Sequence, residues 1–134
     1  PARARARDHA PSLYPAAERA ARTGFDWNDL AEVMAKVEEE WAEFKTAASQ
    51  IQDERSRHMA AVEFGDIIFT LSNVARFVGF HPETALTAAI NKFEKRFRHM
   101  EQAFMRQGTD LEAASRDDMD RAWDTAKENV SSPS

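Results

Sequence analysis

Two pairs of acidic residues recur at the same spacing in this sequence. Glu40 and Glu43 are three residues apart, and so are Glu63 and Asp66. Residues three apart are neighbours on a helix surface, so each pair would present its carboxylates together. If the two helices pack side by side, all of these carboxylates converge. Carboxylate oxygens are the ligands that Mg²⁺ or Mn²⁺ prefers, and such a site can serve water activation and phosphate charge neutralisation.

A pair of basic residues follows further along the chain. Lys92 and Arg96 are four residues apart, on one face of a predicted helix and beside Phe93. Lysine offers a point charge, and arginine offers a fork that matches phosphate oxygens. A carboxylate-bound metal facing these two cations would form a pocket for a polyphosphate, which Asn73 and Arg76 would help to orient.

The helix expected to carry Glu63 and Asp66 is apolar on nearly every side. Its apolar residues, distributed around a helix of about 100° per residue, are Val62, Phe64, Ile67, Ile68, Phe69, Leu71 and Val74. A helix that is apolar all round is typically buried. Burying an unpaired carboxylate is costly, so we expect a cation, either a metal or a basic group, to meet the two acids.

Helical periodicity predicts the elements that position these residues. Long helices are expected over residues 28–52, 56–78 and 82–105, and shorter ones over 16–22 and 116–127. Gly24 suits a helix end, and Asp26 or Asn28 suits the N-cap of the next helix. Residues 53–57 are interpreted as a charged break, and Gly79 with Pro82 as the next boundary. No strand pattern is present, so the sequence predicts an all-α fold.

Composition favours a single soluble domain. The 134 residues, 43% of them hydrophobic, suit one domain over residues 16–130, preceded by a mobile arm over 1–15. Cysteine is absent, which is compatible with a reducing cytoplasm. A net charge of -5 argues against nucleic-acid or membrane partners, and no stretch resembles a transmembrane helix or a signal peptide. The chain begins at Pro1, consistent with processing or with a piece of a longer protein.

Two alternative interpretations compete with a metal-dependent phosphate site. The first is a noncatalytic, oligomeric helical interaction module, in which the acids form structural ion pairs with basic residues. The second is a carboxylate-bridged di-iron bundle. That class requires histidine three residues after a ligating glutamate, and no Glu-x-x-His occurs here. The interaction module therefore stays open as the alternative.

The acidic motifs resemble a known family pattern. Glu39-Glu40-Trp41-Ala42-Glu43, then nineteen residues, then Glu63-Phe64-Gly65-Asp66 is similar to the E-E-x-x-E and E-x-x-D metal-binding pattern of the MazG nucleotide pyrophosphohydrolases, an all-α group. Further segments that resemble the C-terminal MazG domain are Gly24-Phe25-Asp26-Trp27, Asn73-Val74-Ala75-Arg76 and Lys92-Phe93 with Lys95-Arg96-Phe97. The resemblance covers roughly residues 13–127.

The resemblance implies hydrolysis of a nucleoside triphosphate to the monophosphate and pyrophosphate, with Mg²⁺ required. It implies metal ligands at Glu40, Glu43, Glu63 and Asp66, with Glu39 as a helper in water activation. The implied substrate-binding residues are Lys92 and Arg96 for the phosphates, and Asn73, Lys36 and Trp27 for the nucleotide. Family members are dimers or larger, with helices from two subunits in one bundle. We therefore expect a homo-oligomer, at least a dimer, whose four-helix core is completed by dimerisation.

Overall fold

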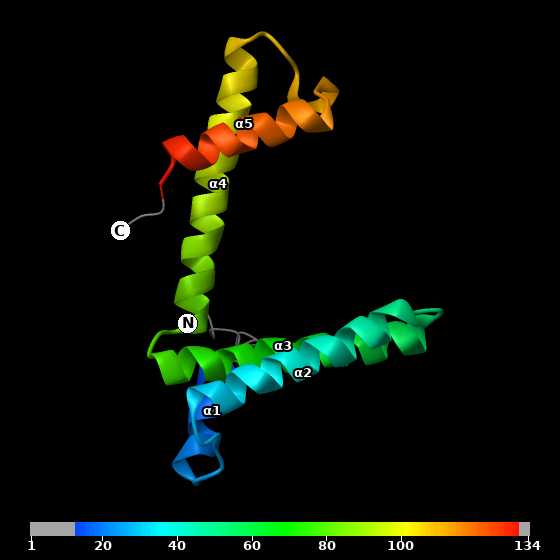
Figure 1. Ribbon diagram of the computed structural model, residues 1–134, viewed down its shortest axis with the longest axis vertical. Coiled ribbons are helices and arrows are strands. Elements are labelled where there is room, and N and C mark those ends of the chain that lie inside the picture. Colours follow the sequence, from blue (N-terminus) through cyan, green and yellow to red (C-terminus); the bar gives the residue numbers. More distant parts are fainter. Residues whose placement is uncertain (1–12, 132–134) are drawn as a thin grey trace, which may run out of the picture. The chain divides into compact units, whose positions relative to one another are not determined.

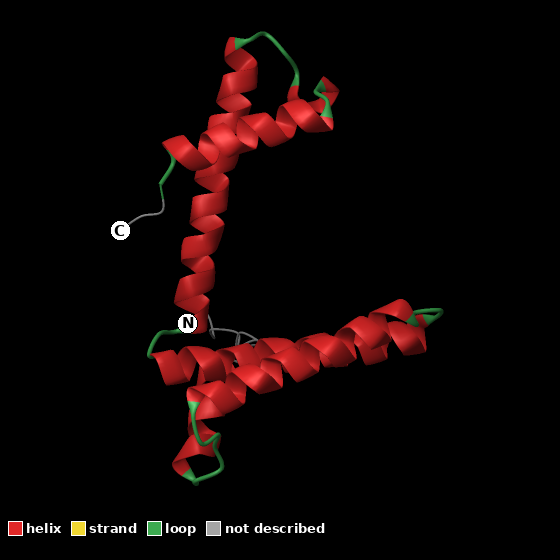
Figure 2. Cartoon of the chain, viewed as in Figure 1, coloured by secondary structure: helices red, strands yellow, loops and turns green. Residues whose placement is uncertain are grey.

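The computed structural model describes residues 13–131 of the chain, and every regular element in this range is helical (Figures 1 and 2). The elements are α1 (Leu13–Arg22), α2 (Leu30–Ser49), α3 (Glu54–Val78), α4 (Pro82–Arg106), the short 3₁₀ helix η1 (Leu111–Ala113) and α5 (Arg116–Asn129). The all-α prediction is therefore confirmed. Of the predicted N-terminal arm, residues 1–12 lie outside the described range, and α1 begins at Leu13.

The helices fall into two compact units, and each unit is described by itself. The first unit, Pro1–Pro82, contains α1, α2 and α3. The second unit, Glu83–Ser134, contains nearly all of α4, together with η1 and α5. The single domain that we expected over residues 16–130 stays a prediction.

The first unit is built on a helical hairpin. Helices α2 and α3 lie side by side and run in opposite directions, and α1 packs against α3 (Figure 1). The buried apolar positions of the unit are small or β-branched residues: Ala17, Val33, Ala60, Ile67 and Ala75. Small side chains at these positions let the helix backbones approach closely. The hairpin thereby brings the acidic face of α2 against the acidic face of α3.

Capping residues set the ends of α2 and α3, and they correct two predictions. The N-cap of α2 is Asp29, whose carboxylate accepts the Glu32 amide hydrogen at 2.8 Å, and not Asp26 or Asn28. The predicted break between these helices is present but its bounds over 53–57 are wrong, because residues 50–53 join the helices and α3 already begins at Glu54. Asp53 and Ser56 form a capping box there, which satisfies amide groups that the start of a helix leaves without partners. Gly79 closes α3 with a φ of 101°, as expected.

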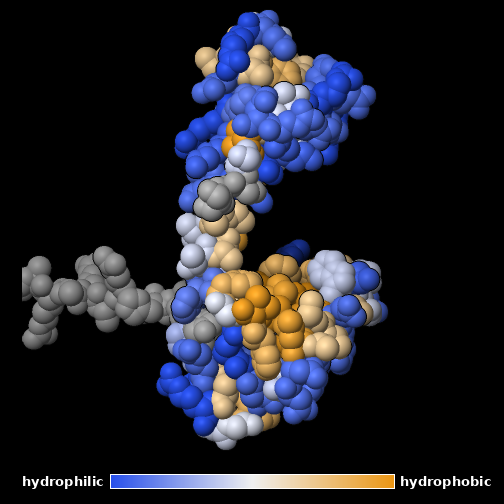
Figure 3. Space-filling view, turned by 60° about the vertical axis from the view of Figure 1, so that its left-hand side comes forward, coloured by the Kyte–Doolittle hydropathy of each residue, from blue (hydrophilic) through white to orange (hydrophobic). Residues whose placement is uncertain are grey.

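The helix α3, which its apolar character predicts to be buried, is only partly covered within the single chain. Its large apolar side chains that remain exposed are Met59, Val62, Phe64, Ile68, Phe69, Leu71 and Val78. Within the first unit only α1 and α2 pack extensively against α3, so a helix that is apolar all round keeps part of its apolar surface uncovered. Figure 3 shows a hydrophobic patch on the first unit, coloured orange. Phe64, Ile68, Leu71 and Val78 recur on one side of α3, and we call these four residues the apolar face. Val62 and Phe69 lie on the other side of the helix.

The second unit is a crossing of α4 and α5. The Phe93 ring lies 5.3 Å from the Trp123 ring and 6.0 Å from the Phe97 ring, between ring centroids. Met100 and Phe104 are buried on α4, and Ala126 is buried on α5. Among the described helices of both units, none combines the length and apolar character that crossing a membrane requires.

Candidate metal centre

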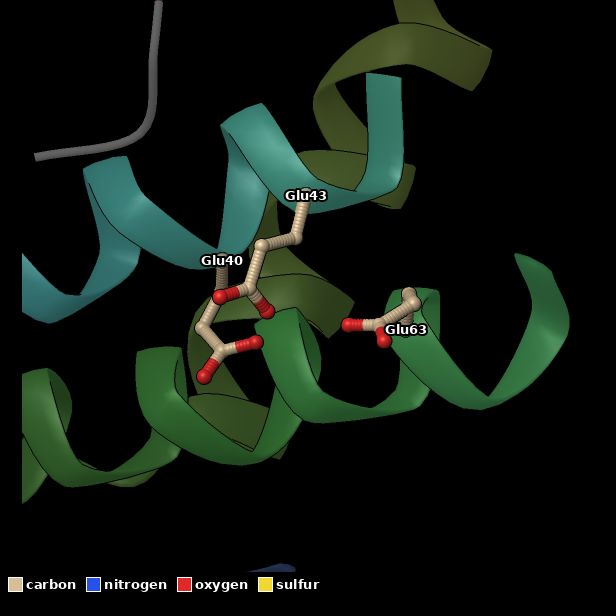
Figure 4. A group of neighbouring side chains, drawn as sticks. All are labelled: Glu40, Glu43 and Glu63. Atoms are coloured by element: carbon tan, nitrogen blue, oxygen red, sulfur yellow. The ribbon is translucent and has the colours of Figure 1, made fainter. Parts of the chain in front are cut away.

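Three of the predicted ligands converge between α2 and α3. Glu40 and Glu43 project from α2 and Glu63 from α3, and one carboxylate oxygen from each lies within 4.8 Å of the others (Figure 4). We call these three residues the glutamate cluster. The matching three-residue spacings predicted this convergence from sequence. Asp66 lies one turn beyond Glu63 on α3, is exposed and is not part of the cluster in this structure.

The glutamate cluster contains buried oxygens with no hydrogen-bond partner. Glu40 is 7% exposed, and its Oε2 accepts no hydrogen bond from any described residue. The Oε2 of Glu63 is likewise buried and unpaired among the described residues. Buried polar atoms in native proteins are nearly always paired, and an unpaired buried carboxylate is costly. Buried carboxylate oxygens without a hydrogen-bond partner are suitable ligands for a hard divalent cation such as Mg²⁺ or Mn²⁺.

Electrostatics in the cluster also favour a cation. The pKa of Glu43 is raised above its ordinary value, first by repulsion from the Glu40 carboxylate, then by burial and by repulsion from Glu63. Repulsion among like charges penalises the ionised cluster in the metal-free protein. A bound cation would remove that penalty, because it favours the charged form of every carboxylate around it.

Lys36 is the basic residue that contacts the cluster. Its Nζ lies 3.2 Å from Glu39 Oε1 and 3.3 Å from Glu40 Oε1, and these hydrogen bonds raise the pKa of Lys36. No described residue forms a salt bridge with Glu43 or Glu63. A set of structural ion pairs, as the interaction-module alternative requires, therefore accounts for only part of the cluster.

Arg76 is engaged elsewhere in the first unit. Its guanidinium binds both carboxylate oxygens of Asp26 and donates to Asn73 Oδ1 at 3.0 Å. Asp26 also accepts the Trp27 amide hydrogen at 2.8 Å. This network ties the loop between α1 and α2 to α3 and fixes the orientation of the buried Asn73 amide. Sequence reasoning missed it, because residues 50 positions apart share no helical periodicity.

The Asp26–Arg76 pair predicts a pH dependence of stability. The Arg76 hydrogen bond holds the pKa of Asp26 below its ordinary value. A depressed folded-state pKa stabilises the protein above the unfolded-state pKa, and this contribution is lost as pH falls through the folded-state pKa. We expect the free energy of unfolding of Asp26→Asn to lie below wild type at about pH 6 and to approach it as pH falls below about 4. Urea unfolding across this range measures the difference, and a constant difference would contradict the prediction.

The two basic residues predicted to hold phosphates lie on α4, in the second unit. Lys92 is partly buried, and Arg96 Nε donates to the backbone oxygen of Val130 at 3.3 Å. This bond anchors Arg96 to the end of α5. Their predicted approach to the carboxylates stays a prediction, because each unit is described by itself.

Comparison with curated proteins identifies relatives over most of the chain. The chain is 38% identical over 110 residues to a nucleoside triphosphate pyrophosphohydrolase/pyrophosphatase MazG of Thermotoga maritima, a match that covers 82% of this chain. It is 34% identical over 110 residues to a nucleoside triphosphate pyrophosphohydrolase of Escherichia coli, again over 82% of the chain. This chain is a homologue of the MazG proteins.

The extent of the match is consistent with one MazG domain. The chain spans 40–41% of the length of the Thermotoga and Escherichia proteins. The chain is also 46% identical over 71 residues to the uncharacterised protein YabN of Bacillus subtilis. This match covers 53% of the chain and 14% of YabN. No family model matches the chain. The glutamate cluster is consistent with a MazG-type metal site, and it adds a geometric observation to the homology.

Proposed function

We propose that this chain hydrolyses nucleoside triphosphates, or their deoxy forms, to the monophosphate and pyrophosphate in a Mg²⁺-dependent reaction. The observation that carries the proposal is the glutamate cluster, with two buried carboxylate oxygens that no described residue satisfies. Homology to proteins named as nucleoside triphosphate pyrophosphohydrolases supports the same reaction.

The residues that would hold the metal are Glu40, Glu43 and Glu63, with Asp66 as a fourth ligand one turn along α3. When bound, Mg²⁺ supplies charge neutralisation for the phosphates and lowers the pKa of a coordinated water. Mn²⁺ can substitute for it, because it prefers the same oxygen ligands. The chemistry of the carboxylates fits either ion, and the buried unpaired oxygens give the reason for binding one.

The other site residues would bind and orient the substrate. Glu39 is exposed beside the cluster and carries a carboxylate that can accept a proton from the attacking water. In the proposal Lys36 binds a phosphate oxygen, a role that its contacts with Glu39 and Glu40 beside the cluster support. In the proposal Lys92 and Arg96 hold the leaving pyrophosphate, and Trp27 and Asn73 contact the nucleoside.

The proposal includes a homodimer. The apolar face of α3 carries Phe64 at 47% and Leu71 at 47% exposure, which are high values for large apolar side chains on a hairpin helix. Packing this face against its copy would place four helices, α2 and α3 from each subunit, in one bundle. The bundle would bury the apolar residues that the single chain leaves in water.

Product analysis tests the proposed reaction. Purified protein is incubated with the eight common ribo- and deoxyribonucleoside triphosphates, with Mg²⁺ and with chelator. We expect monophosphate and pyrophosphate only with metal. Diphosphate and orthophosphate would indicate a phosphatase with a different cleavage site. Absence of turnover together with absence of metal binding would instead favour the noncatalytic interaction module.

A further inference from the structure

A second feature of the first unit is a cavity beside α1, displaced along the hairpin from the glutamate cluster. Its volume is about 260 Å³, and its walls come from α1, the α1–α2 loop, α2 and α3. This volume is just below the usual range for small-molecule sites, so it suits one part of a ligand more than a whole nucleotide. All of its lining residues belong to the first unit.

The cavity has aromatic walls. Phe25, Trp27 and Phe69 line it together with two alanines of α1. Aromatic rings stack on nucleobases with little dependence on sequence, because every base has a flat aromatic face. Asn73, which is only 6% exposed, lines the same cavity with its amide oriented by Arg76. A flat heteroaromatic ring with polar edges matches these walls.

The cavity and the glutamate cluster lie along the same helix faces. On α2, Glu32, Lys36 and Glu40 follow at four-residue steps, so one face runs from the cavity to the cluster. On the antiparallel helix α3, one face carries Asp66, Thr70 and Asn73, and it runs from the side of the cluster to the cavity. At about 1.5 Å rise per residue, the seven residues from Glu63 in the cluster to Thr70 in the cavity wall span about 10 Å. That distance suits a nucleotide with its base in the cavity and its phosphates at the cluster.

The polar atoms of the cavity are mainly hydrogen-bond acceptors. Glu32 Oε2 accepts the Asn28 amide hydrogen at 3.2 Å, and no described residue donates to its second oxygen. Thr70 donates its hydroxyl hydrogen to Asp66 O at 2.8 Å, so its lone pairs are what it offers to a ligand. Asn73 Nδ2 donates to Phe69 O at 3.4 Å, which leaves one amide hydrogen as a donor.

We propose that this cavity binds the base of the substrate and selects bases that carry an exocyclic amino group. The inference rests on the proposed pyrophosphohydrolase function. An amino group donates to the Glu32 carboxylate. Uracil and thymine present a carbonyl oxygen at the position where cytosine has its amino group. That oxygen and the Glu32 carboxylate are both hydrogen-bond acceptors, so no hydrogen bond can form between them. The selected substrates are therefore cytosine and adenine nucleotides, in preference to uracil, thymine and hypoxanthine nucleotides.

The test separates base selection from turnover. Calorimetric titrations compare the non-hydrolysable α,β-imido forms of dCTP and dUTP, which differ at the base in the group at carbon 4 and in the protonation of the adjacent ring nitrogen. We expect the dCTP analogue to bind wild type about tenfold more tightly, as a hydrogen bond to a charged acceptor allows. In Glu32→Gln, whose amide oxygen still accepts from Asn28, the ratio should fall to about threefold or less.

Two further variants serve as controls for Glu32→Gln. Glu38→Gln removes an exposed carboxylate from α2 outside the cavity and should leave the roughly tenfold ratio unchanged. Trp27→Ala removes one wall and should weaken both analogues about tenfold without changing their ratio.

The outcomes distinguish the two proposals. Equal binding of both analogues by wild type, or an unchanged ratio in Glu32→Gln, overturns base selection even if pyrophosphate is released. Equal kcat/KM values for dCTP and dUTP also overturn base selection, but they support the pyrophosphohydrolase function. Failure to bind either analogue, with no turnover of any triphosphate, overturns both proposals.

Discussion

In the Glu63→Gln variant, Mg²⁺-dependent pyrophosphate release should fall on the order of a thousandfold, while the metal-free protein melts no lower than wild type. The substitution keeps the size of the side chain and removes one negative charge. Glu63 has a buried oxygen without a partner among the described residues, and it adds to the repulsion that raises the pKa of Glu43. Removing its charge therefore breaks no ion pair in the described structure, and it relieves repulsion within the cluster.

Loss of turnover without loss of thermal stability distinguishes a metal ligand from a structural residue. A glutamate that holds the fold through an ion pair would lose stability when its charge is removed. A glutamate that serves as a metal ligand would lose metal affinity instead, and Mn²⁺ binding followed by electron paramagnetic resonance measures it directly. Calorimetric melting with chelator measures the stability. A lower melting temperature with unchanged Mn²⁺ binding would contradict the proposed role of Glu63.

Two matched variants complete this experiment. Glu38→Gln removes an exposed carboxylate from α2, outside the cluster, and should change neither Mn²⁺ binding nor turnover. Asp66→Asn tests the ligand that does not belong to the cluster in the described structure. If Asp66 joins the site when metal binds, Asp66→Asn should lose metal affinity and activity as Glu63→Gln does. Full activity in Asp66→Asn would restrict the site to the glutamate cluster.

Local geometry explains which features could be predicted from sequence. The glutamate cluster could be predicted, because residues three apart on a helix always lie together, and two such pairs on adjacent helices can face each other across the hairpin. The end of α3 was also predictable at Gly79, where a residue with a left-handed conformation closes the helix easily. The capping box of Asp53 and Ser56 was missed, because a charged segment was interpreted as a break.

Contacts between distant segments explain what could not be predicted. Asp26 and Arg76 are 50 residues apart, and nothing in the spacing of either indicates the other. Glu32 lines the cavity through the packing of the α1–α2 loop, which no periodicity describes. The surface that covers α3 could not be predicted for a related reason: hydrophobicity indicates that a side chain is to be covered, but not which chain covers it.

The uncovered side chains of α3 lead to the second prediction with a large effect: Leu71→Lys should convert a dimer into a monomer. Leu71 is 47% exposed, and it shares a helical stripe with Phe64 and Ile68, which precede it by seven and three residues along α3. A charged ammonium within an apolar interface must be desolvated without a partner. We expect the dissociation constant to rise roughly a hundredfold or more, the range found for central interface residues.

Size-exclusion chromatography with light scattering measures this change over a range of protein concentrations, with circular dichroism to confirm that the helices persist. Met105→Lys is the matched control, because Met105 is 77% exposed in the second unit and lies outside the apolar face. That variant should remain a dimer. If Leu71→Lys is also a dimer at low concentration, the apolar face is not the subunit interface. If wild type is itself a monomer that hydrolyses triphosphates, the dimer is not needed for the proposed reaction, and the glutamate cluster of one chain suffices.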